Sequence, residues 1–335
     1  MLLTGTGDWA TRMNKLIHAV LACIAICAGA VPALAEDFPS RPITMIVPFA
    51  AGGPTDTIAR IIADRMGRSL GQAVVTENVT GAGGTIAAGR VARAAADGYT
   101  LDLATWSTHV VSPVIYKVQY DVFRDFDPVI WLTQTPLLLV SRTDIPATNL
   151  KELIAWLKAS PHPVLQGSAG GTDQVAGYLL QQQTDAQIQI VSYRGLAPAM
   201  QDLLAGRLDL LFDQPSDAVP QIRSGGIRGY AVTADKRAAV APNVPTVDEA
   251  GLPGLHLTPW HSLWVPKGTP KDIVARLNTA GMEALADPAV RKRLADVGQD
   301  IVPREQQTPE ALITYYRSET EKWWPIIKAA GIKAE

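Results

Sequence analysis

Residues 43–58 read ITMIVPFAAGGPTDTI, and this stretch joins a strand pattern to a helix pattern. Ile43–Val47 is a short apolar run, typical of a buried parallel strand. Pro54 stands where the first turn of a helix would lie, and Gly71 closes that segment. Between them, apolar residues recur at helical spacing: Ile58, Ile61, Ile62, Met66 and Leu70. The stretch therefore predicts a strand, a glycine-rich turn and a helix.

The same alternation continues along the chain. Ala73–Glu77 has the pattern of a second strand, Thr85–Ala96 that of an alanine-rich helix ended by Gly98, and Thr100–Thr105 that of a third strand. A strand–helix–strand–helix–strand order implies right-handed crossovers and a parallel sheet. The expected fold class is α/β.

The pattern repeats beyond residue 140, which predicts a second lobe. Asn149 and Glu152 have the spacing of a capping box for a helix through Leu157. The other segments that we expect in this half are the strands Val164–Gly167, Ile188–Val191, Leu208–Phe212, Ile227–Val232 and Trp260–Val265, and the helices 172–183, 196–205, 216–224, Pro270–Ala286, Pro288–Val297 and Pro309–Ala329.

Two apolar stretches, Leu137–Ser141 and His261–Pro266, could carry the chain between two sheets. We therefore expect residues 36–139 together with 262–335 to form one lobe, and residues 140–261 to form the other. Each lobe should be a mainly parallel sheet flanked by helices. A length of 335 residues is long for one core and suits two lobes of about 120–180 residues.

Composition narrows the function classes. Apolar residues make up 47% of the chain, as in a globular protein. The net charge is −2, which argues against a nucleic-acid partner, because that needs a basic face. Small anions remain possible ligands, because backbone amides can bind them without Lys or Arg.

The N-terminus has the layout of a secretory signal peptide. Arg12 and Lys15 precede the uncharged apolar run Leu16–Val31, and Ala33-Leu34-Ala35 is a cleavage pattern. The alternative is a membrane anchor, but a bilayer span needs about 20 apolar residues. We expect residues 1–35 to be removed after export to the periplasm, and translation could begin at Met13.

Both cysteines, Cys23 and Cys27, lie inside this segment. The mature chain would then lack cysteine, which excludes disulfides, thiol catalysis and cysteine metal sites. Lipidation at Cys23 is the alternative, although few apolar residues precede it. No other run reaches membrane-spanning length, so we expect a soluble mature protein.

Ligands of open parallel sheets bind beyond the carboxyl ends of the strands, so the loops there are the candidate site. The first loop offers a glycine pair and the start of a helix, where free N–H groups and the helix dipole favour an anion. Its Asp56 could stabilise the helix start or bind the ligand. The candidate ligand-binding residues of this loop are Phe49, Ala51, Gly52, Gly53, Thr55 and Asp56.

Further candidates follow the later strands. Hydroxyl groups after the third strand could reach the cleft or cap a helix. The second lobe repeats the design of a glycine-rich turn before a helix. An arginine there is a candidate although such a residue is usually a surface charge, and an aspartate could line the cleft or cap a helix. The candidates are Trp106, Ser107, Thr108, Ser168, Gly171, Thr172, Tyr193, Arg194 and Asp213.

Motifs of catalysis and cofactor binding are missing from the sequence. Gly81-Ala82-Gly83-Gly84 superficially resembles a dinucleotide fingerprint, but Ile86 stands at the third glycine position. Gln166 stands where a nucleophile elbow needs glycine. No histidine pair has metal-ligand spacing. We therefore expect no metal, no cofactor and no catalytic residue; a secreted hydrolase or isomerase using Asp56 or Asp213 is the alternative.

An ordered set of motifs identifies a family. The chain closely resembles the Bug family, the receptors of tripartite tricarboxylate transporters, over about residues 37–332. The motifs that carry the resemblance are Pro48-Phe49-x-x-Gly52-Gly53-x-x-Asp56, Glu77-Asn78-x-x-Gly81-Ala82-Gly83-Gly84, Tyr193-Arg194-Gly195, Asp202-Leu203-Leu204-Ala205-Gly206, Phe212-Asp213, Ala231-Val232-Thr233, Pro245-Thr246-Val247-x-Glu249-Ala250-Gly251 and Gly268-Thr269-Pro270.

The resemblance implies a two-lobed, type II-like periplasmic binding protein that closes on a ligand in the cleft between its lobes. It implies di- or tricarboxylate, acidic amino acid or aromatic carboxylate ligands, held by the loops Phe49–Asp56 and Ser168–Thr172. It also implies delivery to a two-component membrane permease, with a periplasmic sensor as the alternative. We expect a monomer.

The second glycine-rich loop departs from the family pattern. The loop that begins at Ser168 looks about two residues shorter than usual, and Asp173 would bring a negative charge to the distal carboxylate position. The distal group of the ligand could therefore be neutral, amino or aromatic.

Overall fold

The computed structural model describes residues 37–332, together with residues 9, 13 and 18. The chain divides into two units, Met1–Ser40 and Arg41–Glu335, and the two sheets below belong to the second unit. The predicted signal peptide, its cleavage pattern and both cysteines lie outside the described residues, apart from the three isolated positions. In the described part of the chain, no helix has the length and apolar character needed to cross a membrane.

The first sheet has six strands in the order β11-β4-β10-β3-β1-β2. Strand β1 lies between β2 and β3 and is parallel to both, so the predicted parallel unit is confirmed. Strands β10 and β11 run antiparallel to their neighbours. The strands are β1 (Ile43–Val47), β2 (Val74–Asn78), β3 (Thr100–Thr105), β4 (Phe126–Gln134), β10 (Trp260–Pro266) and β11 (Asp300–Ile301).

The second sheet has five strands in the order β7-β6-β8-β5-β9. Strand β6 is parallel to β7 and β8, whereas β5 is antiparallel to β8 and β9. Its strands are β5 (Leu138–Arg142), β6 (Val164–Ser168), β7 (Ile188–Ser192), β8 (Leu210–Asp213) and β9 (Ile227–Val232).

Both sheets are mixed because the chain passes twice between them. It leaves the first sheet at the end of β4, enters the second as β5, and returns from β9 into β10. A strand that enters a sheet from the edge where the other strands end must run against them. Strands β5 and β10 are these entering strands. We call each sheet with the helices packed on it the first and the second lobe; the lobe boundaries proposed from the sequence stay a prediction.

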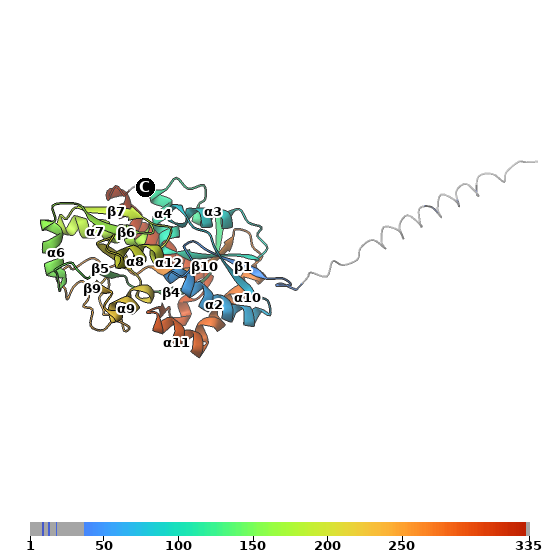
Figure 1. Cartoon of the computed structure of the whole chain (residues 1–335). Coiled ribbons are helices and arrows are strands. Elements are labelled where there is room, and N and C mark those ends of the chain that lie inside the picture. Colours follow the sequence, from blue (N-terminus) through green and yellow to red (C-terminus); the bar gives the residue numbers. More distant parts are fainter. Residues whose placement is uncertain (1–8, 10–12, 14–17, 19–36, 333–335) are drawn as a thin grey trace, which may run out of the picture. The chain divides into compact units, whose positions relative to one another are not determined.

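Helices cover the sheets (Figure 1). Helices α2, α10 and α12 pack in the first lobe, and α8 and α9 in the second. Their bounds are α2 (Pro54–Leu70), α3 (Thr85–Ala92), α4 (Ser112–Ile115), α5 (Val122–Asp125), α6 (Leu150–Ala159), α7 (Thr172–Thr184), α8 (Leu196–Leu204), α9 (Pro215–Ser224), α10 (Lys271–Ala286), α11 (Pro288–Asp296) and α12 (Pro309–Ala329), with short 3₁₀ turns at Ala82–Gly84 and Arg304–Gln306.

A few elements differ from the sequence prediction. The helix predicted to reach Ala96 ends at Ala92, where exposed residues follow and burial supports no further turn. Strand β4 was not predicted; its Pro128 has no N–H to donate, which hides the strand pattern. The capping box is half right, because Asn149 accepts from the N–H of Glu152, whereas the Glu152 carboxylate accepts from the N–H of Thr148.

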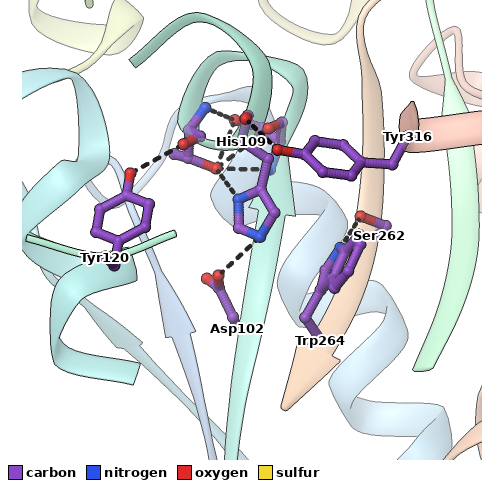
Figure 2. A network of polar contacts seen from close by, with 8 residues as sticks. Asp102, His109, Tyr120, Ser262, Trp264 and Tyr316 are labelled. Carbon is purple, nitrogen blue, oxygen red and sulfur yellow. Dashed lines mark hydrogen bonds and ion pairs between the residues drawn. The ribbon is translucent and has the colours of Figure 1, made fainter. Parts of the chain in front are cut away.

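A buried polar network lies in the core of the first lobe (Figure 2). It surrounds a π-helical turn, Ser107–Val111, at the end of β3. The hydroxyl of Tyr120 donates to the Thr108 carbonyl at 3.0 Å, and that of Tyr316 donates to the His109 carbonyl at 3.0 Å. Nε2 of His109 lies 3.6 Å from the Asp102 carboxylate. The network holds the turn in place from inside the lobe.

Both ionisable groups of the pair are kept neutral by burial. Asp102 is 1% exposed and His109 is fully buried. Desolvation raises the pKa of Asp102 to about 8 and lowers the pKa of His109 to about 3. The folded protein thus holds a proton on Asp102 at a pH where the unfolded chain has released it.

The first prediction concerns this proton. Because the folded pKa of Asp102 is raised, its contribution to stability is lost as the pH rises through about 8. Urea unfolding between about pH 7 and 8, where an unfolded histidine is mostly neutral, should show the stability falling with pH. In Asp102→Asn this fall should be smaller. Asp97→Asn, which changes an exposed carboxylate, should leave it unchanged; equal slopes in wild type and Asp102→Asn would contradict the prediction.

Candidate functional site

The largest concentration of predicted site residues surrounds a pocket between the lobes. Its empty volume is about 550 Å³, including the part open to solvent, which lies within the usual range for small-molecule sites. Among the described residues, no Lys or Arg side chain lines it. The lining residues are Phe49, Ala50, Gly53, Pro54, Thr55, Thr105, Ser107, Leu137, Ala169, Gly170, Thr172, Asp173, Leu196, Gln214, Pro259, Trp260 and His261.

The first loop is held by Asp56, which is 3% exposed. One carboxylate oxygen accepts from the N–H of Gly52 at 2.9 Å and from Nε of Arg60 at 2.8 Å. The other accepts from Nη2 of Arg60 and Nδ2 of Asn78, both at 3.0 Å. Of the two roles left open by the sequence, these four bonds favour stabilisation of the turn and helix start.

The electrostatics of Asp56 agree with this role. Burial by itself would raise the pKa of the carboxyl group, but the hydrogen bonds from Arg60, Gly52 and Asn78 and the positive charge of Arg60 lower it below its usual value. Asn78 also donates to the Phe49 carbonyl at 2.9 Å. Hydrogen bonds of Asp56 and Asn78 therefore stabilise the turn that carries Phe49 and Gly53 at the pocket wall.

The second loop has the same construction. The N–H of Ala169 donates to the carboxylate of Asp173 at 2.7 Å, four residues ahead, as Gly52 does to Asp56. The glycines that precede α7, Gly170 and Gly171, have φ of +82° and +85°, which favours glycine. The two lobes thus present equivalent aspartate-held turns, each at the N-terminus of a helix.

The second loop differs from the first in charge. Asp173 lines the pocket, is 4% exposed and has no arginine partner comparable to Arg60 within residues 37–332. Burial raises its pKa to about 6, against the opposing effect of hydrogen bonds from Ser168 and Ala169. This side of the pocket therefore carries an acidic group that is readily protonated.

The lobes touch each other at small residues. The Ser107 hydroxyl lies 2.9 Å from that of Thr172 and accepts from the Thr172 N–H at 3.0 Å. A Cβ added to Gly171 would overlap the Ser107 side chain. On the other side, the N–H of Ala50 donates to the Arg194 carbonyl at 3.3 Å. The cleft is closed by these contacts.

The two segments that link the sheets are bonded to each other. The N–H of Thr135 donates to the Pro259 carbonyl at 2.9 Å. The N–H of Leu137 donates to the Thr233 hydroxyl at 2.9 Å, and this hydroxyl donates to the Leu257 carbonyl at 2.7 Å. We call these two bonded linking segments, residues 135–137 and 233–259, the hinge; Leu137 and Pro259 from them line the pocket.

The structure brings only part of the predicted site to the pocket wall. Phe49, Gly53, Thr55, Ser107 and Thr172 line it. Ala51, Gly52 and Asp56 belong to the first turn behind it, and Ser168 and Gly171 to the second. The ligand-binding role of all these residues stays a prediction.

The other predicted site residues have different surroundings. The indole of Trp106 donates to Glu319 at 2.7 Å and packs edge-on against Trp323 in the core. Thr108 is buried and accepts from the N–H of Thr105. Neither Trp106 nor Thr108 lines the pocket.

The remaining candidates lie in the second lobe and are also absent from the pocket wall. The Tyr193 hydroxyl donates to Asp202 at 2.7 Å, and Arg194 is exposed. Asp213 is buried beside Asp217, and burial first, then the neighbouring carboxylate, raises its pKa well above the usual value. Within residues 37–332, no group of three His, Cys, Asp or Glu side chains gathers as a metal site would require.

Several lining residues escaped the prediction because they come from the hinge. Leu137, Pro259, Trp260 and His261 belong to the crossing segments, which carry no glycine-rich signal. Asp213 was a predicted site residue, but the residue that follows it, Gln214, is the one that lines the pocket. For the four residues of the crossing segments, the sequence offered one indication: they lie in or directly before the predicted lobe crossings.

The role of Asp56 gives the second prediction. Asp56→Asn loses the paired bonds to Arg60 and should destabilise the protein by about 1–3 kcal/mol at neutral pH. Because the folded pKa is lowered, this contribution disappears as the pH falls through the folded pKa, below the ordinary value of 3.8. Chemical denaturation measures both effects.

The matched control is Asp64→Asn on the same helix. Asp64 also pairs with an arginine four residues on, Arg68, but both side chains are exposed. Its cost should stay within about 0.5 kcal/mol. Equal costs for the two variants would show that the turn does not depend on Asp56.

Comparison with known proteins agrees with this architecture. The family model described as the tripartite tricarboxylate transporter family receptor matches residues 58–332. MatC (Rpa3494) from Rhodopseudomonas palustris, solved with bound malate, is 39% identical, with a TM-score of 0.83 over 87% of this chain and 100% of that chain. The periplasmic binding protein BugD is 38% identical, with a TM-score of 0.84 over 89% and 100%.

A third solved structure, R. palustris Rpa4515 with adipate, is 34% identical, with a TM-score of 0.84 over 89% of this chain and 99% of that chain. The predicted two-lobed fold and the family resemblance are confirmed. The extent of the family match and the shared fold lead to one conclusion: this chain belongs to the tripartite tricarboxylate transporter receptor family, which includes the Bug periplasmic binding proteins.

Proposed function

We propose that this protein is a periplasmic receptor that captures a small carboxylate by closure of its two lobes and passes it to a two-component membrane permease. The observation that carries the proposal is the pocket enclosed between two equivalent glycine turns, each at the N-terminus of a helix. The ligands in the neighbouring structures, malate in MatC and adipate in Rpa4515, support a carboxylate.

Backbone N–H groups are the donors suited to the anionic group. With no Lys or Arg from the described residues in the pocket wall, a carboxylate has to be met by main-chain amides, hydroxyl groups and helix dipoles. Helix α2 offers this at Thr55, through its first-turn N–H and its hydroxyl group, supported by the Asp56 clamp; the N–H of Gly53 has only a long contact, 3.4 Å, with the Ala50 carbonyl. In α7 the N–H of Thr172 is already bonded to Ser107. The α2 end is therefore the proposed carboxylate subsite.

The location and the partner of the protein follow from the family. A receptor of this family works outside the cytoplasmic membrane, which agrees with the signal-peptide pattern in residues 1–35. We expect a monomeric mature chain from residue 36, with a permease of the tripartite tricarboxylate type as partner. The family description, a transporter receptor, supports binding without turnover.

A thermal-shift screen tests the proposal. The panel contains malate, succinate, adipate, citrate, aspartate and benzoate, each beside its amide where one exists. A ligand present at about 100 times its Kd stabilises the fold by about 2.7 kcal/mol, which shifts the Tm measurably. We expect at least one acid to raise the Tm and its amide to have much less effect.

Two outcomes would contradict the proposal. Equal shifts with acids and amides would mean that the pocket does not recognise a carboxylate group. Chemical conversion of a bound acid during incubation would favour an enzyme. Mass spectrometry of the denatured, freshly purified protein shows whether a co-purified ligand already fills the cleft and has to be removed before the screen.

Closure gives a further prediction. A Cβ added to Gly195 would lie 3.0 Å from both the N and the Cβ atoms of Ala50 in the opposite lobe. The backbone of Gly195 is extended, with φ of 169°, so alanine meets no backbone strain there. Gly195→Ala should weaken binding of the best acid of the panel by about three- to tenfold, because crowding opposes only the closed form. Isothermal titration calorimetry gives the Kd.

The control is Gly89→Ala, the same substitution inside α3. Its Cβ would find ordinary contacts at 3.4 Å from Arg93 and 3.8 Å from Tyr120, both in the first lobe. This variant should bind as the wild type does. Unchanged affinity in Gly195→Ala would mean that the ligand is held without closure at this contact.

A further inference from the structure

His261 occupies an unusual place in the pocket wall. It lies on β10, the strand that returns from the second lobe, and pairs with Thr105 on one side and Thr133 on the other. The register of the pairing with β4 shifts between His261 and Ser262, because β4 has one extra residue there, Leu132. Bulges near binding sites turn a side chain out of the regular alternation. Here the bulge is in the neighbouring strand, and the residue opposite it, His261, lines the pocket.

One nitrogen of the His261 imidazole lacks a hydrogen bond. His261 is 1% exposed, and its Nε2 has no hydrogen-bond partner within residues 37–332. A buried polar atom without a partner costs about 1–3 kcal/mol. Such an atom at a pocket wall indicates a partner on the ligand.

Hydrogen bonds behind the ring decide what this nitrogen can do. The Thr133 hydroxyl donates its one hydrogen to Oε1 of Gln299 at 2.9 Å. Gln299 in turn donates to Oε1 of Gln214 at 3.2 Å, which fixes the orientation of its amide. The Thr133 oxygen then has its lone pairs available to the His261 ring, whose Nδ1 lies 3.5 Å away.

This contact favours the tautomer with the proton on Nδ1, in which Nε2 is an acceptor. Burial supports the neutral state, because desolvation lowers the pKa of His261 to about 3. The other ionisable side chain in the pocket wall, Asp173, also offers acceptor oxygens. Two acceptors, with no cation from the described residues at the wall, are unsuited to an unsubstituted carboxylate and suited to a hydrogen-bond donor.

We propose that His261 determines the specificity of this receptor by accepting a hydrogen bond from a hydroxyl or ammonium group of the bound acid, so that the ligand is a hydroxy- or amino-substituted carboxylate. Asp173 favours the ammonium form of that group through its charge. The inference rests on the proposed carboxylate-binding function and specifies the second polar group of the ligand.

Calorimetric titration with three four-carbon acids tests the inference: succinate, malate and aspartate, which differ only in a hydrogen, a hydroxyl or an ammonium group. The wild type should bind malate or aspartate more tightly than succinate. In His261→Phe, which keeps a ring but has no nitrogen, this preference should fall by about tenfold, the value of one hydrogen bond. In His261→Gln, whose amide oxygen can replace Nε2 as acceptor, most of the preference should remain.

Two further variants separate the contributions. Asp173→Asn keeps an acceptor and removes the charge, so the preference for aspartate should fall while that for malate stays. His256→Phe changes an exposed histidine away from the pocket wall and should leave all three affinities unchanged. Melting curves without ligand verify that each variant is folded.

The outcomes distinguish a failure of the specificity role from a failure of the proposed function. If the wild type binds one of the acids and His261→Phe keeps the same preference, the role of His261 is wrong and the carboxylate receptor stands. If succinate binds as tightly as malate and aspartate in the wild type, the inference is also wrong. If no acid of the wider panel binds the ligand-free wild type, the proposed function itself fails.

Discussion

The geometry of the site depends on one repeated interaction, a backbone N–H that donates to an aspartate four residues ahead. Gly52 with Asp56 and Ala169 with Asp173 make this bond at the start of α2 and α7. Each bond closes a turn that places a helix N-terminus at the pocket. Both turns contain glycines with left-handed backbone, which other residues rarely adopt. Without these clamps, the two helix ends would not face one shared space.

The same interaction has opposite electrostatic consequences in the two lobes. Arg60 neutralises Asp56, so the first turn presents a helix dipole to an anion without a competing negative charge. Asp173 has no such partner in the described part of the chain, and burial raises the pKa of its carboxyl group. The pocket is thus asymmetric, anion-binding at one end and rich in acceptors at the other. In the proposed function, this asymmetry gives a bound acid a defined orientation.

The contacts between the lobes depend on a rigid first lobe. Ser107 touches Thr172 from a π-helical turn whose carbonyl groups accept from Tyr120 and Tyr316, two tyrosines from different parts of the chain. Buried polar networks of this kind specify a single arrangement when their members are paired. Together with the bonds of Thr135 and Thr233 in the hinge, this network holds the pocket wall on the side of the first lobe.

Local patterns were sufficient for most of the fold. The bounds of β1, α2, β9 and α12 follow from apolar periodicity, proline at the helix start and glycine at the end, all of which act within a few residues. The family followed from the order of the glycine turns. Strand β4 was missed because its Pro128 contradicts a strand locally, whereas pairing on both sides with β10 and β11 stabilises it.

The sequence predicted pocket residues only where a recognisable motif, a glycine-rich turn, directly follows a strand. Glycine turns after strands marked Phe49, Gly53 and Thr172 as neighbours of the pocket. The direction of a side chain, in contrast, depends on packing: Trp106 turns into the core to reach Glu319, although Ser107 beside it lines the pocket. His261 reaches the pocket because the chain returns through the hinge as β10 and pairs there with β3 and β4. That placement depends on residues far apart in sequence, so only the tertiary structure decides it.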